Sequence, residues 1–61
     1  MDNISASHPL CVEAREVRDQ LVADGGDERL ISKLNALLAL PFLHGGQQIT
    51  LRGLIAEARL K

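Results

Sequence analysis

Hydrophobic residues recur at helical spacing in the first third of the chain. Leu10, Ala14, Val17 and Leu21 follow one another at intervals of four, three and four residues, which places them on one face of a helix. Ser7 is a suitable N-cap for this helix. Pro9 then falls in its first turn, where a missing N–H costs nothing. We therefore predict a helix that begins just after Ser7.

A glycine pair separates this helix from the next one. Gly25–Gly26 offers a position that adopts positive φ easily, which is typical of a helix C-terminus. Asp27 is the N-cap expected for the second helix, and Glu28 adds negative charge at the positive end of its dipole. So short a connection favours an antiparallel helical hairpin.

The segment Leu30–Leu43 is the most apolar part of the chain. After Asn35 it is apolar on every side until His44, a pattern typical of a helix that is buried from more than one direction. Pro41 disfavours helical geometry at the residue before it, so the helix should end near Leu40. Two apolar residues follow, Phe42 and Leu43, and we expect them to fold back over the end of the core.

A short third helix is expected within Gln47–Lys61. Thr50 is its predicted N-cap, with Ile49 packing against Leu54 as a hydrophobic staple. Its apolar face comprises Leu51, Leu54, Ile55 and Ala58. A short strand over residues 48–52 is the alternative, because Ile49 and Leu51 alternate with polar residues.

These elements predict an all-α fold, a helical hairpin plus a short third helix. Residues 1–6 show no periodicity and are expected to form a flexible tail, while residues 7–61 form one small domain. A chain of 61 residues is marginal as a monomer. Its one cysteine, Cys11, excludes an intrachain disulfide. We therefore expect stabilisation by self-association into a dimeric helical bundle.

Composition points to a cytoplasmic protein. The N-terminus lacks the basic and apolar regions of a secretory signal. The apolar segment is too short and too interrupted to cross a membrane. Gly25–Gly26 also occurs where double-glycine secretion leaders end, but cleavage there would expose the core segment that follows. A free cysteine fits a reducing compartment.

Chemistry-bearing residues are sparse. His8 and Cys11 lie three apart and would face the same way on a helix, but two ligands do not complete a zinc site. Cys11 has only His8 as a neighbouring base in sequence, and no phosphate loop or serine elbow is present. We expect no metal, no cofactor and no catalytic residue.

The amount of apolar surface predicts an interaction protein instead. We expect a small non-enzymatic regulator, inhibitor or adaptor whose leucine-rich helical surface binds a second copy or a larger protein. The predicted contact residues are Leu34, Leu37, Leu38 and Phe42, followed by Leu51, Leu54 and Ile55.

The alternative is a dimeric DNA-binding regulator that uses the start of the last helix. Glutamine and arginine read base edges from the N-terminal end of a recognition helix. The candidate DNA contacts are Gln47, Gln48, Thr50 and Arg52. Against this alternative, the net charge is −1, and about nine residues separate the last two predicted helices, where a helix-turn-helix needs about three or four.

Overall fold

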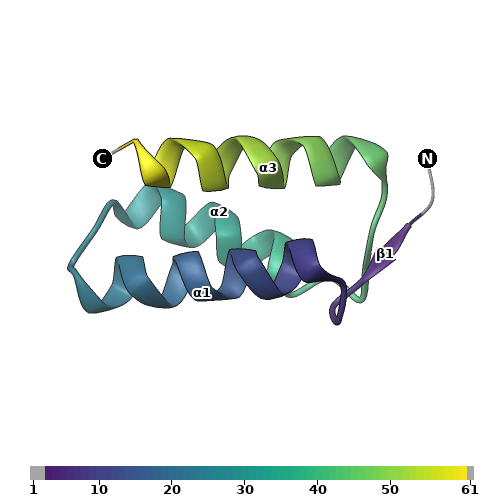
Figure 1. Ribbon diagram of the computed structural model, residues 1–61, viewed down its shortest axis with the longest axis horizontal. Helices are drawn as coiled ribbons and strands as arrows, with labels where there is room; N and C mark the ends of the chain where they lie inside the picture. The colour runs from purple at the N-terminus through teal and green to yellow at the C-terminus, as the bar shows by residue number, and fades with distance from the viewer. Residues whose placement is uncertain (1–2, 61) are drawn as a thin grey trace.

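The computed structural model describes residues 3–60, which form three helices and a minimal sheet. In chain order the elements are β1 (Ile4–Ser5), α1 (Pro9–Ala23), α2 (Glu28–Leu38), β2 (Phe42–Leu43) and α3 (Gly45–Arg59). The molecule is elongated, measuring 33 by 17 by 17 Å. Each helix packs against the other two. Helices α1 and α2 both lie on the same side of α3 (Figure 1). The all-α class is confirmed.

Helix α1 begins at Pro9, and its N-cap is His8 rather than the predicted Ser7. The backbone N–H of Leu10 donates to His8 Nδ1 at 3.1 Å. Ser7 lies in the preceding turn, where its hydroxyl is hydrogen-bonded to that of Ser5. Pro9 occupies the first turn as expected. An imidazole nitrogen therefore caps the helix, where the sequence predicted a serine hydroxyl.

The Gly25–Gly26 turn ends α1 by satisfying two of its last carbonyls. Gly25 has φ 66°, and its N–H donates to the carbonyl of Val22 at 3.3 Å. The N–H of Gly26 donates to the carbonyl of Leu21 at 2.7 Å. This pair of bonds is a Schellman motif. Asp27 then caps α2, its Oδ1 accepting from the N–H of Arg29 at 2.9 Å, as predicted.

Helix α2 buries one face only. Leu30 and Leu34 are buried, and Ile31, Leu37 and Leu38 are partly buried. Ala36, Ala39 and Leu40 are exposed. The expectation that the segment would be enclosed from several directions is therefore wrong for this chain by itself. The physical reason is that α1 and α3, the helices that pack on α2, cover only the face that carries Leu30 and Leu34.

The two strands tie the N-terminal residues to the connection between α2 and α3. Ile4 pairs with Leu43 and Ser5 with Phe42 in an antiparallel ladder. Ile4 packs against the core and Leu43 is 1% exposed, whereas Phe42 is 59% exposed. Residues 4 and 5 thus belong to the folded domain rather than to a tail, while Met1 and Asp2 lie outside the described residues. Of the predicted fold-back, Leu43 covers the core and Phe42 does not.

Helix α3 begins six residues earlier than predicted. His44 is its N-cap, and a reciprocal capping box joins it to Gln47. The His44 N–H donates to Gln47 Oε1 at 3.0 Å, and the Gln47 N–H donates to His44 Nδ1 at 3.3 Å. Thr50 therefore lies in the middle of the helix rather than at its N-cap, and Ile49 does not form the predicted hydrophobic staple. The alternative of a short strand over residues 48–52 is wrong, because these residues are helical. At fifteen residues, α3 equals α1 in length, and only residues 39–44 separate it from α2.

The core lies where the three helices and β2 meet. The largest fully buried side chains are Leu34 of α2, Leu43 of β2 and Leu51 of α3. The other buried apolar residues are Cys11, Ala14, Leu30, Leu54 and Ile55. Every element except β1 contributes a buried side chain, so the domain depends on all of them at once.

We expect Leu34→Ala to lower the free energy of unfolding by about 3 kcal/mol, because the leucine side chain is fully buried and its loss leaves a cavity. Urea denaturation followed by circular dichroism measures the change. Val22→Ala is the matched control, since Val22 is 58% exposed and its truncation should change stability by less than about 0.5 kcal/mol. Equal effects of the two substitutions would contradict the assignment of Leu34 to the core.

We expect His44→Ala to cost about 1 kcal/mol of stability, because it removes the side-chain partner of the Gln47 N–H at the start of α3. Thr50→Ala should be neutral within about 0.5 kcal/mol, since the Thr50 hydroxyl only donates back to the Gly46 carbonyl within the helix. Thermal unfolding of the two variants compares these sites. A larger loss at Thr50 would place the N-cap where the sequence analysis had it.

Candidate functional site

Four of the seven predicted partner-binding residues lie in the core. Leu34 and Leu51 are 0% exposed, and Leu54 and Ile55 are each 6% exposed. These side chains pack against α1, α2 and β2 rather than against solvent. A partner cannot reach them while this fold is intact. Their burial stabilises the domain.

The remaining three predicted contacts differ among themselves. Leu37 and Leu38 are partly buried and pack against the core. Phe42 points outward on β2 and is 59% exposed. Neighbouring Leu40 is 37% exposed. Of the predicted set, Phe42 alone offers most of its side chain to a partner.

The candidate DNA contacts are divided by the early start of α3. Gln48 is 6% exposed, and its Nε2 donates to the carbonyl of Leu43 at 3.1 Å. Gln47 is engaged in the capping box. Thr50 and Arg52 are exposed. Gln48 is thus committed to the interior, whereas Thr50 and Arg52 face solvent.

The outward face of α2 is mostly polar, and that of α1 is mixed. On α1 the exposed positions include Glu16, Asp19 and Gln20, together with two valines, Val12 and Val22, that stand ten residues apart. On α2 they include Glu28 and Ser32, with further exposed polar residues at Arg29, Lys33 and Asn35. Neither helix carries a continuous apolar face among its exposed residues.

The outward face of α3 is different. Ile49, Gly53, Ala56 and Leu60 follow one another at intervals of four, three and four residues, and all four are exposed. Ile49 is 60% exposed and Leu60 is 87% exposed. We call these four residues the α3 outer face. It runs from the second turn of α3 to Leu60, the residue that caps its C-terminus, and it lies opposite the buried residues Leu51, Leu54 and Ile55.

Gly53 lies in the middle of the α3 outer face, and neither its backbone conformation nor packing among the described residues requires a glycine there. Its φ is not positive, and a Cβ added there would meet nothing within 4 Å. Glycine in a helix interior costs about 1 kcal/mol relative to alanine. The cost is therefore not offset by any contact among the described residues. A second helix approaching this face would benefit from the small side chain.

Charges flank the α3 outer face asymmetrically. With 3.6 residues per turn, Arg52 and Arg59 share one flank, and Thr50 and Glu57 share the other. Arg59 forms an ion pair with Glu13 of α1. Within residues 3–60, Arg52 and Glu57 form no ion pair. Both are exposed and available to a neighbouring molecule.

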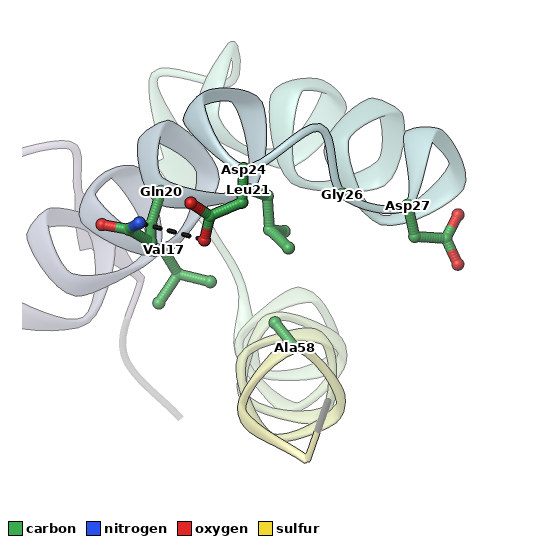
Figure 2. Close-up of a pocket in the computed structure, with 7 residues that line it drawn as sticks. All are labelled: Val17, Gln20, Leu21, Asp24, Gly26, Asp27 and Ala58. Carbon is green, nitrogen blue, oxygen red and sulfur yellow. Dashed lines mark hydrogen bonds between the residues drawn. The ribbon is translucent and has the colours of Figure 1, made fainter.

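A hollow of about 330 Å³ opens beside the Gly25–Gly26 turn. It is lined by Val17, Gln20, Leu21, Asp24, Gly26, Asp27 and Ala58 (Figure 2). Val17, Leu21 and Ala58 face one another across it, and a hydrogen bond of 3.0 Å joins Gln20 to Asp24 at its edge (Figure 2). The Asp27 carboxylate points away from the hollow.

His8 and Cys11, the pair three residues apart in sequence, lie in different surroundings in the structure. His8 Nδ1 is occupied by the Leu10 N–H, and Cys11 is 3% exposed in the core. No group of three or more His, Cys, Asp or Glu side chains suitable for a metal ion occurs within residues 3–60. Each of the two residues has a structural explanation: one caps a helix and the other packs.

Comparisons with known proteins return no match: no family model, no curated protein and no solved structure resembles the chain significantly. Among residues 3–60, no helix has both the length and the apolarity that a membrane crossing requires. The site must therefore be interpreted from its own geometry.

Sequence reasoning missed the α3 outer face because it began the helix at Thr50. That start left Ile49 outside the helix and hid the spacing that joins Ile49 to Gly53, Ala56 and Leu60. The signal that finds it is the second apolar periodicity, once α3 is extended back to Gly45. The helix then carries two apolar faces, of which one is the core face.

We expect Gln48→Glu to lower the free energy of unfolding by about 2 kcal/mol at neutral pH, because an ionised carboxylate cannot donate to the Leu43 carbonyl and is itself buried. Acidic solution protonates the introduced carboxyl and restores a donor. Part of the loss should therefore be recovered, relative to the unsubstituted protein, as the pH falls to about 4. Urea denaturation at several pH values measures it.

Ser32→Glu is the control for this experiment, since it adds the same charge at an exposed position of α2. It should lack both the large loss and the acid recovery. A Gln48→Glu variant as stable as the control at neutral pH would show that Gln48 is not held as described.

Proposed function

We propose that this protein is a small non-enzymatic interaction module, a regulator, inhibitor or adaptor that presents a helical apolar surface for self-association or for binding a partner protein. The observation that carries the proposal is the α3 outer face, where Ile49 and Leu60 expose most of their side chains to solvent. An apolar helix face left in water favours contact with another molecule.

The surface proposed here is not the one that the sequence suggested. The core already buries four of the residues that the sequence suggested: Leu34, Leu51, Leu54 and Ile55. The binding role passes to the opposite side of α3, with Phe42 and Leu40 as a smaller exposed apolar area. In this proposal the hairpin of α1 and α2 is a support that holds α3 straight and buries its inner face.

Several features agree with a binding role rather than catalysis. In the hollow at the Gly25–Gly26 end, the Asp24 carboxylate accepts from Gln20 and the Asp27 carboxylate caps α2, so both carboxylates at this hollow have structural partners. The buried thiol of Cys11 lies among apolar side chains, where it acts as a small hydrophobic group. A cytoplasmic location is part of the proposal, since a reducing compartment suits one free cysteine.

DNA binding remains the alternative, now supported by Thr50 and Arg52 rather than by Gln48. A DNA-binding surface uses clustered positive charge, and the chain has a net charge of −1. Salt separates the two functions, because phosphate contacts weaken steeply as salt rises whereas apolar contacts do not.

Light scattering after size exclusion tests the proposal, at two protein and two salt concentrations. We expect the molar mass to rise toward that of a dimer with protein concentration and to depend only weakly on salt, because the exposed contacts are mainly apolar. A monomer under every condition would contradict self-association. Binding to duplex DNA that is lost as salt rises would favour the alternative.

A further inference from the structure

We infer that the α3 outer face binds the same face of a second copy of this chain, with the two α3 helices side by side and parallel. This inference rests on the proposed function and specifies its partner and geometry. All four residues of the face are exposed. Helices α1 and α2 both lie on one side of α3 (Figure 1), so within residues 3–60 the other side is open to a second helix.

The residues of the face suit helix-on-helix packing. Small residues, Gly53 and Ala56, occupy its middle, and larger ones, Ile49 and Leu60, stand at its two ends. A Cβ at Gly53 would have open space, so the helix backbone itself is accessible there. Two such faces meet with their backbones close at the centre and their large side chains packed at the ends. The intervals of four, three and four residues match the apolar repeat of a coiled-coil seam.

The flanking charges select a second copy in parallel orientation. In a parallel two-fold pair, the flank that carries Arg52 meets the partner's flank that carries Glu57. This contact occurs twice by symmetry. In an antiparallel pair, like flanks meet, and Arg52 comes near Arg59 of the second chain. Ion pairs at such flanking positions set the orientation of paired helices.

Two features make Arg52 and Glu57 suitable for this contact. Both are exposed, and neither forms an ion pair with another residue in the described range 3–60. Arg59 on the basic flank is already paired with Glu13 of its own chain. The complementarity therefore belongs to Arg52 and Glu57. The contact is one helix face wide, so we expect a reversible dimer that dissociates on dilution.

Sedimentation of substituted proteins over a concentration series tests the surface. Ala56→Glu should raise the dissociation constant of the dimer by about tenfold or more, because the two symmetric carboxylates would face each other at the centre of the contact. Ser32→Glu, on the polar outward face of α2, should leave it within about twofold. Circular dichroism of each diluted variant verifies that the monomer is folded.

Charge reversal tests the orientation. Arg52→Glu and Glu57→Arg should each weaken the dimer by about tenfold, since each makes two symmetric contacts repulsive. The double variant should return to within about threefold of the original protein, because the pairing is restored with reversed signs. Additive losses in the double variant would overturn the proposed pairing.

Cross-linking gives an independent readout of the same geometry. Ile49 and Leu60 are eleven residues apart, or about 16 Å along a helix. In the parallel dimer an Ile49→Cys substitution brings the two introduced thiols together across the symmetry axis, close enough for a disulfide. In an antiparallel dimer they stand far apart, and each faces Leu60 of the other chain. The unsubstituted protein, whose single Cys11 is buried, is the control.

A disulfide-linked dimer of the Ile49→Cys protein supports the inference. Cross-links that form only when Ile49→Cys and Leu60→Cys proteins are mixed would overturn the parallel orientation. A dimer that survives Ala56→Glu unchanged would overturn the α3 outer face while leaving the proposed self-association intact. A protein that stays monomeric at every concentration would contradict both.

Discussion

Burial of three leucines from three different elements is the constraint on which this small domain depends. Leu34, Leu43 and Leu51 are the largest fully buried side chains, and they come from α2, β2 and α3. A chain of this length with one cysteine has no disulfide to compensate for a weak core. Leu43 lies at the centre of this arrangement, because its strand pairing brings Ile4 to the core and its carbonyl accepts from buried Gln48. The short sheet thus determines where α3 begins.

A side-chain cap then sets the residue at which α3 begins. His44 follows Leu43 directly and forms a capping box with Gln47, so the helix starts as soon as the strand ends. This early start gives α3 two further turns, and with them Ile49 becomes part of the helix surface. Because Leu51, Leu54 and Ile55 face inward, Ile49, Gly53, Ala56 and Leu60 must face outward. The proposed interaction surface is therefore a direct consequence of the packing that stabilises the core.

The sequence predicted correctly those structural features that depend on residues close together in the chain. The face of α1, the Gly25–Gly26 turn and the Asp27 cap all follow from residues close in the chain, and all three predictions are confirmed. The helix starts at His8 and His44 were missed, since histidine is an uncommon cap and a serine or threonine stood nearby. The β1–β2 pairing was missed because two-residue strands have no periodicity and exist only through a contact between residues about forty positions apart.

The sequence by itself determined the helical class of the protein and the position of its first turn, because helical spacing and glycine conformation act over a few residues. It also contained both apolar faces of α3. Only the tertiary structure decided which of them is the core, because burial depends on what α1, α2 and β2 bring against the helix rather than on the hydrophobicity of its own residues. That choice moved Leu34, Leu51, Leu54 and Ile55 from candidate contacts to core residues and left the opposite face in water.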